Sequence, residues 1–564
     1  MQKLFIRILP ILCAVESSVI AGTWTPLAHP PPRAAGHFLL LSDGTVMAED
    51  LGTGYGPGWF RLRPDSHGSY ANGTWTTLAP MHYTRLDFSS IVLRDGRVLV
   101  AGGEYGSGTN TAEVFDPVAN SWTLTGPAPA GQVAFFDSGA VLLSNGKVLI
   151  APVHPATYGG TVLYDPVANT LSAGATLYRG YYQDEASWVK LPDDSILTID
   201  PFGTNSERYV PSANTWVNDS NVPVSLYDPY GSELGPALLL PNGKAIFFGS
   251  TGHTAIYTPS GTTSPGSWVA GPDIPNGQGM PDAPGAMMVN GKCLLAVSPI
   301  PTSGNHFPSP VSFCEYDYVT NNFTQVSAPG GGTTFAGPCW PTLMLDLPDG
   351  TVLFGHRNTD FYVYQPGGSP LAAGKPTILS MTTNADASLH LTGTLFNGIS
   401  QGASYGDDEQ MDSNFPIVRF TATDGTVRFG RTYDWSSTGV MTGNAVLTTD
   451  CTMPAGASLA DSIQVLANGI ASDPLPTLII STNPAVLNVT GILPGGAFWF
   501  LFHQPAASKL HSFCEQRYYP AGEHLVQRRP RHGDPVRLRL FPVRRSSLYE
   551  QRDSLLPRSL SVEQ

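Results

Sequence analysis

A short two-strand pattern recurs seven times along the chain at nearly constant spacing. One copy runs from Ser90–Leu93 through the pair Asp95-Gly96 to a second apolar stretch, Val98–Ala101. An Asp-Gly pair between two short apolar stretches predicts a β-hairpin, because glycine accepts the positive φ angle that a tight hairpin turn requires. Successive turns lie 52, 50, 48, 49, 48 and 59 residues apart. The seven turns are at Asp43-Gly44, Asp95-Gly96, Asn145-Gly146, Asp193-Asp194, Asn242-Gly243, Asn290-Gly291 and Asp349-Gly350.

Each repeat adds two further strands after its hairpin. The third strand carries a Tyr or Phe followed by a turn, as in Val114-Phe115-Asp116-Pro117. The fourth begins at a large apolar residue, and a ring at the same place in every sheet predicts core packing between twisted sheets. Four strands in a period near 50 residues predict the blades of a β-propeller. The fourth-strand residues are Trp24, Trp75, Trp122, Leu171, Trp216, Trp268 and Phe323.

The repeated Gly-Gly, Tyr-Asp-Pro and Trp pattern resembles the kelch repeat family over about residues 24–371. The first repeat starts inside a blade, at Trp24, so an early strand and a late strand are expected to share one sheet. That pairing closes the ring and leaves no free sheet edge. We therefore predict an all-β protein whose residues 22–373 form a seven-bladed kelch-type β-propeller.

A second domain is predicted after the propeller. From Lys375 the period of about 50 residues stops, and short alternating stretches such as Ser388–Thr392 and Ser462–Leu466 predict an immunoglobulin-like β-sandwich over residues 374–482. A kelch propeller followed by such a module resembles the galactose oxidase and glyoxal oxidase superfamily, whose C-terminal domain is of this E-set type. The order of the two domains carries that resemblance.

The two ends of the chain differ from the body. Lys3 and Arg7 precede the apolar stretch Ile8–Val15, which predicts a signal peptide over residues 1–21 with cleavage before Gly22. The protein is accordingly expected to be secreted or extracytoplasmic. Residues 483–564 are basic and lack alternating patterns. Either the reading frame is lost near His503, or this is a genuine basic tail for an anionic surface.

Charge and apolar patterning exclude some partners. The net charge is −14, and the residues before Ala485 hold 19 Lys and Arg against 38 Asp and Glu. Such an acidic body repels phosphate backbones, so no nucleic acid partner is expected. After the N-terminus no stretch is apolar and long enough for a transmembrane segment. A monomer is expected.

Cys293 and Cys314 fall in the sixth repeat and form either a disulfide or two buried free thiols.

Candidate ligand-binding residues precede the innermost strand of each blade, where propeller loops gather at one mouth of the central channel. Three interpretations of the acids found there remain open: a site for a hard cation such as Ca²⁺, a site for sugar hydroxyls or a cationic ligand, or caps for the backbone of each acid's own loop. Ala35 and Cys339 interrupt the series in repeats one and seven. The acids are Asp87, Asp137, Asp184, Glu233 and Asp282.

Further candidates lie in nearby loops. Arg85 shares its loop with Asp87, and His306 lies in the long insertion from Pro299 to Pro310. His306 also belongs to a set of histidines that follow second strands and are candidates for the same mouth; the others are His154, His253 and His356. A dense acidic loop offers weak calcium candidates, namely Asp407, Asp408 and Asp412.

The resemblance to galactose oxidase implies a test for copper. Members of that superfamily place a Tyr-His pair of copper ligands before the inner hairpin of the last blade, where this chain has Trp340-Pro341. A further His ligand is expected early in the sandwich domain, where this chain has Gly398–Gly402. Copper is therefore not expected. Ca²⁺ is a candidate, and the sequence indicates no other cofactor.

The combined prediction is a secreted, non-catalytic recognition protein that binds an extracellular glycan or protein at the channel mouth. The alternative is an enzyme: a carbohydrate or alcohol oxidase of the galactose oxidase type with altered copper ligands, or a metal-assisted hydrolase or lyase.

Overall fold

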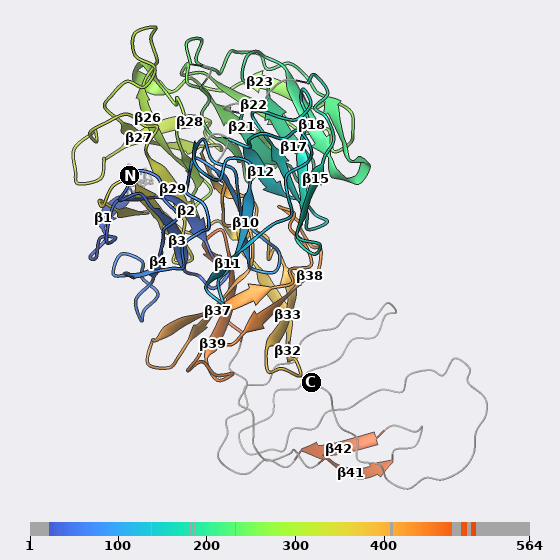
Figure 1. Ribbon diagram of the computed structural model, residues 1–564. Helices are drawn as coiled ribbons and strands as arrows, with labels where there is room; N and C mark the ends of the chain where they lie inside the picture. Colours follow the sequence, from blue (N-terminus) through green and yellow to red (C-terminus); the bar gives the residue numbers. More distant parts are fainter. Residues whose placement is uncertain are drawn as a thin grey trace, which may run out of the picture. The chain divides into compact units, whose positions relative to one another are not determined.

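The chain is almost entirely β-structure in its computed structural model (Figure 1). The structure describes residues 22–136, 138–180, 183, 186–231, 233–405, 410–475, 487–492 and 498–502. Two compact units are present, Met1–Thr477 and Leu478–Gln564. Within the second unit, strands β41 (Leu487–Ile492) and β42 (Phe498–Phe502) form a two-stranded sheet. None of the helices in the described part of the chain has the length and apolar character needed to cross a bilayer.

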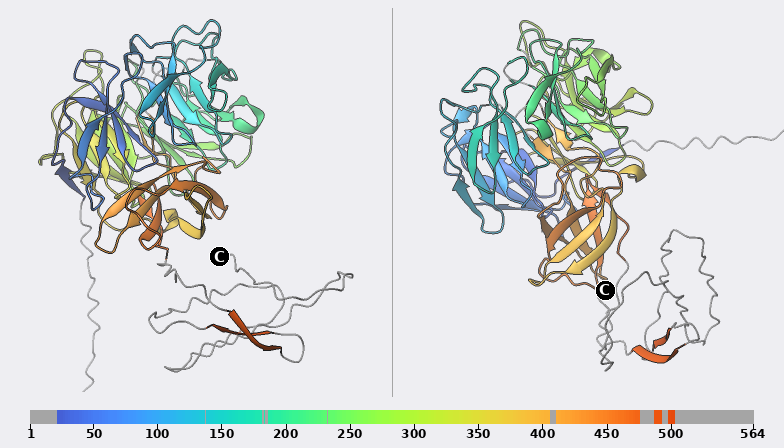
Figure 2. Two further views of the ribbon diagram at one scale, coloured as in Figure 1. Left: turned by 60° about the horizontal axis from the view of Figure 1, so that its bottom comes forward. Right: turned by 90° about the vertical axis from the view of Figure 1, so that its right-hand side faces the viewer.

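Seven four-stranded antiparallel blades form the propeller, as the sequence predicts (Figure 2). Blades 1 to 3 are β2 (Ala35–Leu40), β3 (Val46–Asp50), β4 (Trp59–Arg63) and β5 (Thr74–Thr77); β7 (Ser89–Val92), β8 (Val98–Ala101), β10 (Ala112–Asp116) and β11 (Ser121–Leu124); and β12 (Gly139–Leu142), β13 (Val148–Ala151), β14 (Val162–Asp165) and β15 (Thr170–Ala173).

Blades 4 to 7 continue the same order from the channel outward. They are β16 (Trp188–Lys190), β17 (Ile196–Ile199), β18 (Ser206–Val210) and β19 (Thr215–Asn218); β20 (Ala237–Leu239), β21 (Ala245–Phe248), β22 (Thr254–Thr258) and β23 (Ser267–Ala270); β25 (Gly285–Met287), β26 (Cys293–Pro299), β27 (Ser312–Asp317) and β28 (Asn322–Val326); and β29 (Leu343–Asp346), β30 (Val352–Gly355), β31 (Tyr362–Gln365) and β1 (Thr23–Pro26).

Short elements lie between these strands. Six blades are separate four-stranded sheets, whereas blade 6 belongs to a seven-stranded sheet. The short elements are β6 (Arg85–Leu86), β9 (Tyr105–Gly106), β24 (Gln278–Gly279) and the 3₁₀ helices η1 (Pro211–Ala213), η2 (Pro275–Gly277) and η3 (Ala372–Gly374).

The ring closes by pairing the first strand with the last blade. Strand β1 lies antiparallel to β31 with Trp24 opposite Tyr364, so the predicted closure is confirmed. The two rings lie 4.7 Å apart between centroids. The same pairing recurs in other blades, as with Phe115 opposite Trp122. The fourth-strand aromatics therefore pack against third-strand aromatics, as expected for core residues.

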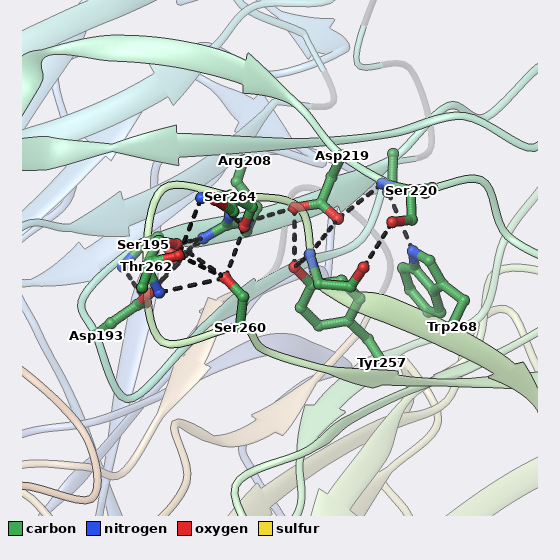
Figure 3. Close-up of polar contacts among 12 residues, drawn as sticks. Asp193, Ser195, Arg208, Asp219, Ser220, Tyr257, Ser260, Thr262, Ser264 and Trp268 are labelled. Atoms are coloured by element: carbon green, nitrogen blue, oxygen red, sulfur yellow. Dashed lines mark hydrogen bonds and ion pairs between the residues drawn. The ribbon is translucent and has the colours of Figure 1, made fainter.

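Neighbouring blades are also joined by buried polar contacts, shown for blades 4 and 5 in Figure 3. Arg208 of β18 has no exposed side chain and is paired with Asp219. Its guanidinium also donates to the carbonyl oxygens of Thr262, at 3.1 Å, and Ser264, at 2.6 Å, in blade 5. The Tyr257 hydroxyl donates to Asp219 at 2.8 Å. Because each of these groups is satisfied, the cluster fixes one blade against the next.

The β-sandwich follows the propeller. One long strand, β37, joins its two sheets, since Val427–Gly430 pair with β36 and Arg431–Tyr433 pair with β38. Side chains from both sheets form a separate core that includes Leu391, Phe420 and Val465. The strands are β32 (Thr377–Thr383), β33 (Leu389–Thr394), β36 (Ile417–Thr421), β37 (Val427–Tyr433), β38 (Leu447–Thr452), β39 (Ser462–Ala467) and β40 (Ile470–Ala471).

The sandwich packs against the face of the propeller formed by the repeated hairpin turns, here called the hairpin face. The Thr432 amide donates to the Ser42 carbonyl oxygen at 3.1 Å, and the Val427 amide donates to the Ser66 carbonyl oxygen at 2.8 Å. Lys190 of blade 4 donates to the Thr438 carbonyl oxygen at 2.8 Å. These contacts leave the opposite end of the channel away from the sandwich.

A hairpin between the sandwich strands β33 and β36 enters the central channel. Its strands are β34 (Gly402–Ser404) and β35 (Gln410–Asp412), and β34 pairs with β25 of blade 6. The hairpin also lies against innermost strands of other blades, including β2, β7 and β29. It therefore occupies the part of the channel nearer the sandwich. Its pairing with β25 makes blade 6 part of a larger sheet.

Of the two alternatives for Cys293 and Cys314, the structure shows the free thiols. Cys293 and Cys314 are both buried free thiols on adjacent strands of blade 6. Burial raises the pKa of the Cys314 thiol to about 12, so the thiol stays protonated at neutral pH. The alternative, two buried free thiols, describes the structure.

Candidate functional site

The candidate site is the end of the channel opposite the sandwich, here called the mouth. Two sets of loops form this face: those joining the second to the third strand of each blade, and those joining one blade to the next (Figure 2). Each described acid of the series lies on a loop of the second set. Asp87, Glu233 and Asp282 are described, whereas Asp137 and Asp184 lie outside the described residues.

Glu233 and Asp282 lie on adjoining loops of blades 5 and 6. The Asp282 amide donates to the carbonyl oxygen of Leu234 at 3.0 Å, which joins the two loops directly beside Glu233. Burial raises the pKa of the Cys339 thiol in blade 7, and the negative charges of Asp282 and Glu233 raise it further. Two of the predicted acids therefore lie near each other and near the residue that interrupts the acid series.

Asp87 reaches across the first blade. Its carboxylate accepts a hydrogen bond from Arg357 of blade 7 at 2.7 Å, and both side chains are mostly buried. Blade 1 has Ala35 and Gly36 at this level, and a Cβ on Gly36 would lie 3.3 Å from Cγ of Arg357. Small residues in blade 1 thus leave room for an arginine to join blades 7 and 2. This explains physically why the acid series stops at Ala35.

Aromatic side chains lie beside this ion pair. The Arg357 guanidinium lies 5.3 Å from the centroid of the Trp340 ring, which is a cation–π contact. Phe307 lies 6.1 Å from Trp340 between ring centroids. Tyr405, directly after β34, donates its hydroxyl to the Trp340 carbonyl oxygen at 2.5 Å. The hairpin that enters the channel thereby fixes the backbone of Trp340 from the channel side.

His306 lies over the loop of blade 5. Its ring is 6.2 Å from the ring of Tyr230, and a Cβ on Gly231 would lie 2.8 Å from Nδ1 of His306 and 3.5 Å from Cγ of Glu233. The absence of a side chain at Gly231 therefore allows the insertion of blade 6 to approach Glu233. The structure brings His306, Glu233 and Asp282 into the same part of the mouth.

Arg85 has a different position from the one that its loop suggests. Its side chain is fully buried and paired with the equally buried Glu113 at 3.0 Å. The guanidinium also donates to the carbonyl oxygens of Gly102, at 2.5 Å, and Gly108, at 2.7 Å. No ligand reaches such a group without unfolding the loop. We therefore correct the prediction for Arg85 from ligand contact to positioning of the loop that carries Asp87.

The other predicted histidines differ among themselves. His253 is half exposed and contacts Asp273 at 2.8 Å on the outer part of its own blade. His154 lies against the Phe136 ring at 5.0 Å. His356 is next to Arg357, and burial lowers its pKa, so its imidazole is neutral at physiological pH.

Asp412 lies inside the channel, where it lines the same cavity as Lys190. Burial raises its pKa to about 6, while the nearby ammonium group of Lys190 opposes that rise. The same burial lowers the pKa of Lys190. Asp412 lines two cavities of ≈ 10 Å³ each, and such a volume holds about one water molecule. Asp407 and Asp408 lie outside the described residues. Within the described ranges, no cluster of three or more His, Cys, Asp and Glu residues is arranged to hold a metal ion.

All six exposed aromatic side chains of the described residues lie on loops of the mouth face. Their exposed fractions run from 46% to 62%. The exposed large side chains on the turns between third and fourth strands, at the opposite face, are valines, such as Val118 and Val319. The six aromatics are Tyr55, Tyr105, Tyr158, Tyr178, Phe202 and Tyr230.

With this geometry established, the chain can be compared with known proteins. The sequence model of the Kelch motif matches residues 88–128. The chain contains a Kelch motif. The matched residues span all four strands of blade 2 and the start of the next loop. No curated protein sequence matches the chain.

Solved structures resemble the kelch propeller at low identity. A fungal alcohol oxidase of the AA5 family in complex with copper is 13% identical, with a TM-score of 0.48, over 81% of this chain and 98% of that chain. A catalytically inactive variant of virginiamycin B lyase from Staphylococcus aureus, solved with quinupristin, is 12% identical, with a TM-score of 0.42, over 61% of this chain and 99% of that chain. At these values no activity is transferred to this chain.

The described residues do not fit the copper site that the galactose oxidase resemblance implies. At the level of the expected Tyr-His pair, Trp340 offers no metal ligand. The preceding Cys339 is a buried thiol whose pKa is raised to about 12, chiefly by burial. Its sulfur lies 3.1 Å from the Ser298 hydroxyl and 3.3 Å from the Pro281 carbonyl oxygen that accepts its hydrogen bond. A thiol held protonated in this way is a poor metal ligand.

Sequence reasoning missed Arg357, Trp340 and Tyr405 as parts of the mouth. A signal for Arg357 was present, because it directly follows His356, one of the histidines selected for their position after a second strand. Trp340 was excluded as a copper ligand and was not considered as an aromatic contact. Tyr405 has no local signal, because only the entry of the hairpin into the channel brings it to Trp340.

Proposed function

We propose that the protein is a secreted recognition protein that binds an extracellular glycan at the mouth of its kelch propeller. One observation carries the proposal: the mouth combines the carboxylates of Glu233, Asp282 and Asp87 with the gathered exposed aromatics of the molecule. Carboxylates accept hydrogen bonds from sugar hydroxyls. Exposed aromatic rings supply large apolar area with few rotatable bonds, against which the C–H faces of sugar rings pack.

The electrostatics of the mouth support a ligand without negative charge. The protein carries a net charge of −14, and Asp87, Glu233 and Asp282 all lie on loops of the mouth face. Negative charges near a binding site repel acidic ligands. A neutral glycan avoids that repulsion and still uses the carboxylates as hydrogen-bond acceptors. Export is proposed from the N-terminal pattern, whose residues 1–21 lie outside the described part.

The test is a glycan array probed with the full-length protein and with the E233Q/D282N variant. We expect neutral glycans to bind the wild-type protein, and we expect the variant to lose most of that binding while it unfolds at the same temperature. A matched control is D116N/D165N, which removes two negative charges on the opposite face. The asparagine oxygens still accept the backbone hydrogen bonds that Asp116 and Asp165 accept in their turns.

Three outcomes would contradict the proposal. If no glycan binds and a protein ligand is captured at the mouth instead, the glycan assignment is wrong. If E233Q/D282N binds as well as the control variant, the site is not at these acids. Stoichiometric copper in the purified protein, measured by elemental analysis, would favour the enzyme alternative.

A further inference from the structure

The mouth carries a continuous series of aromatic and charged side chains, and this series extends from its centre to its rim. It begins at the rim with Tyr55 of blade 1 and Tyr105 of blade 2. Their rings are stacked, 6.4 Å apart between centroids and inclined by 24°, and about half of each side chain is exposed. The two tyrosines therefore form one stacked and half-exposed pair of rings, here called the platform, that a ligand can reach.

Backbone pairing holds this aromatic surface in place. Strand β6 lies between the two tyrosine segments, since Leu86 pairs with Tyr105 and Arg85 pairs with Gly56, next to Tyr55. The buried side chain of Arg85 fixes β6 from below, so the platform has a rigid base. A rigid base lowers the entropic cost of ligand binding.

The platform adjoins the ion pair near the channel axis. The amide of Glu104, next to Tyr105, donates to the Asp87 carbonyl oxygen at 2.9 Å. Asp87 in turn binds Arg357, which lies over Trp340. A backbone hydrogen bond therefore ties the platform segment to the loop of Asp87, and side-chain contacts continue from Asp87 to Arg357 and Trp340.

The series continues on the other side of the centre. Trp340 lies 6.1 Å from Phe307, and the neighbouring His306 lies 6.2 Å from Tyr230 of blade 5 between ring centroids. Tyr230 is 50% exposed, like the platform tyrosines. Rings thus stand at both rims and at the centre, with hydrogen-bonding groups between them.

We infer that the mouth binds a linear, neutral oligosaccharide of several units, lying from the Tyr55–Tyr105 platform across Trp340 to Tyr230. This inference rests on the proposed function and narrows its ligand. A single sugar fills one aromatic contact, whereas a chain reaches the successive ones, and each added contact increases affinity. Acids at the mouth disfavour an acidic polymer. A branched or globular ligand would leave the far platform unused.

The experiment measures affinity against chain length. Full-length protein is titrated calorimetrically with neutral β-1,4-linked oligosaccharides, from monosaccharide to hexasaccharide, in the gluco, xylo, manno and N-acetylated chito series. We expect affinity to rise with length in at least one series, by about tenfold for each aromatic contact reached. The Y55A/Y105A variant and the Y230A variant should each remove part of that rise.

The control variant is V118A/V319A, which shortens two exposed apolar side chains on the opposite face. It should show the wild-type dependence on length, and thermal unfolding should show all variants folded. Binding that is independent of length, or unchanged in Y55A/Y105A, would overturn the inference and leave the proposed function in place. Tighter binding of an acidic oligosaccharide would also overturn it. If no oligosaccharide binds and the glycan array is also blank, the proposed function itself fails.

Discussion

The two faces of the propeller use their repeated acidic and amide side chains in different ways. On the hairpin face, each such residue closes its own turn: Asp43 accepts from the amide of Thr45 at 3.0 Å, and Asn145 accepts from the amide of Lys147 at 3.0 Å. At the mouth, Asp87 instead reaches Arg357, a residue 270 positions away in another blade. Repetition on the hairpin face therefore serves local structure, whereas at the mouth Asp87 joins separate blades.

Repetition of an acid along the chain has two explanations: the acid caps its own turn, or it acts outside that turn. The contacts of Asp87 distinguish between them. An acid that recurs because its turn recurs binds its own backbone, as in the Asx turns of the hairpin face. Asp87 departs from that rule, and it lies among exposed aromatics. The hairpin face is covered by the sandwich, while the mouth keeps its apolar rings exposed to solvent. One face therefore packs against the second domain, whereas the other is where we propose that a ligand binds.

The largest expected change in stability concerns Arg85, a buried residue that supports the loops of the mouth. In the R85A variant, buried Glu113 loses its cationic partner, and we expect the free energy of unfolding to fall by about 3–5 kcal/mol. Denaturant unfolding measures this change. The matched control is R33A, which removes a largely exposed arginine from its pair with Asp50 and should cost about 0–1 kcal/mol. Equal effects in the two variants would mean that Arg85 does not support the platform loops.

The second prediction tests the cover of the hairpin face with two equivalent glycines. Gly44 and Gly146 have φ angles of 73° and 82° in equivalent turns. A Cβ on Gly44 would lie 2.7 Å from the ring of Phe429 in the sandwich, whereas a Cβ on Gly146 has no atom within 4 Å. Backbone strain alone should cost about 1–2 kcal/mol in G146A.

The G44A variant adds a steric clash of about 1–3 kcal/mol to the same strain. The difference between the two variants, measured by denaturant unfolding, therefore reports the contact between propeller and sandwich. Equal losses would show that the sandwich does not press on this turn in solution.

A third prediction concerns pH and the channel beneath the mouth. Burial raises the pKa of Asp346 to about 8, and the Ser413 hydroxyl partly opposes the rise. Between the unfolded value near 3.9 and this folded value, the folded protein holds a proton that the unfolded chain has released. Stability should therefore decrease as pH rises, by about 1.4 kcal/mol or less per unit up to pH 8.

Asp412, whose pKa is about 6, adds to this slope only below about pH 6. Unfolding curves between pH 5 and pH 8 should therefore be steeper in the acidic half of the range. The D346N variant should remove the slope that remains above pH 6. A slope unchanged in D346N would assign the dependence to another group.

Much of the fold follows from the sequence because its signals are local and repeated. A turn residue, two apolar stretches and an aromatic at fixed spacing define each blade without reference to distant residues. Ring closure also follows, since a chain that begins inside a blade at Trp24 has its partner strand in the last repeat.

The parts that sequence analysis missed depend on distant contacts. Pairing of β34 with β25 joins Ser404 to Gly285, and nothing in either segment indicates the other. Likewise, an arginine in a loop beside an acid suggests exposure, but Arg85 is buried by Glu113, which lies on β10. Local pattern predicts elements well, whereas the depth of a charged side chain depends on the assembled blades.

The last prediction compares one acid from each face. The D43A variant removes the cap of a hairpin turn and should lower the free energy of unfolding by about 1 kcal/mol, without changing glycan binding. The D87N variant keeps a residue that tolerates the φ of 49° and an oxygen that accepts from Arg357, but it removes the charge from a mostly buried pair and should cost about 1–3 kcal/mol. It removes a carboxylate from the mouth, however, so binding should weaken.

The opposite pattern would contradict the comparison between the faces. If D87N loses stability as D43A does and binds glycan as the wild-type protein does, then Asp87 is a structural residue like those of the hairpin face. An R357Q variant then identifies the cause, because it removes the charge of the partner and leaves the Asp87 carboxylate in place. Weakened binding in D87N with normal binding in R357Q assigns the ligand contact to the carboxylate itself, whereas equal weakening assigns it to the ion pair.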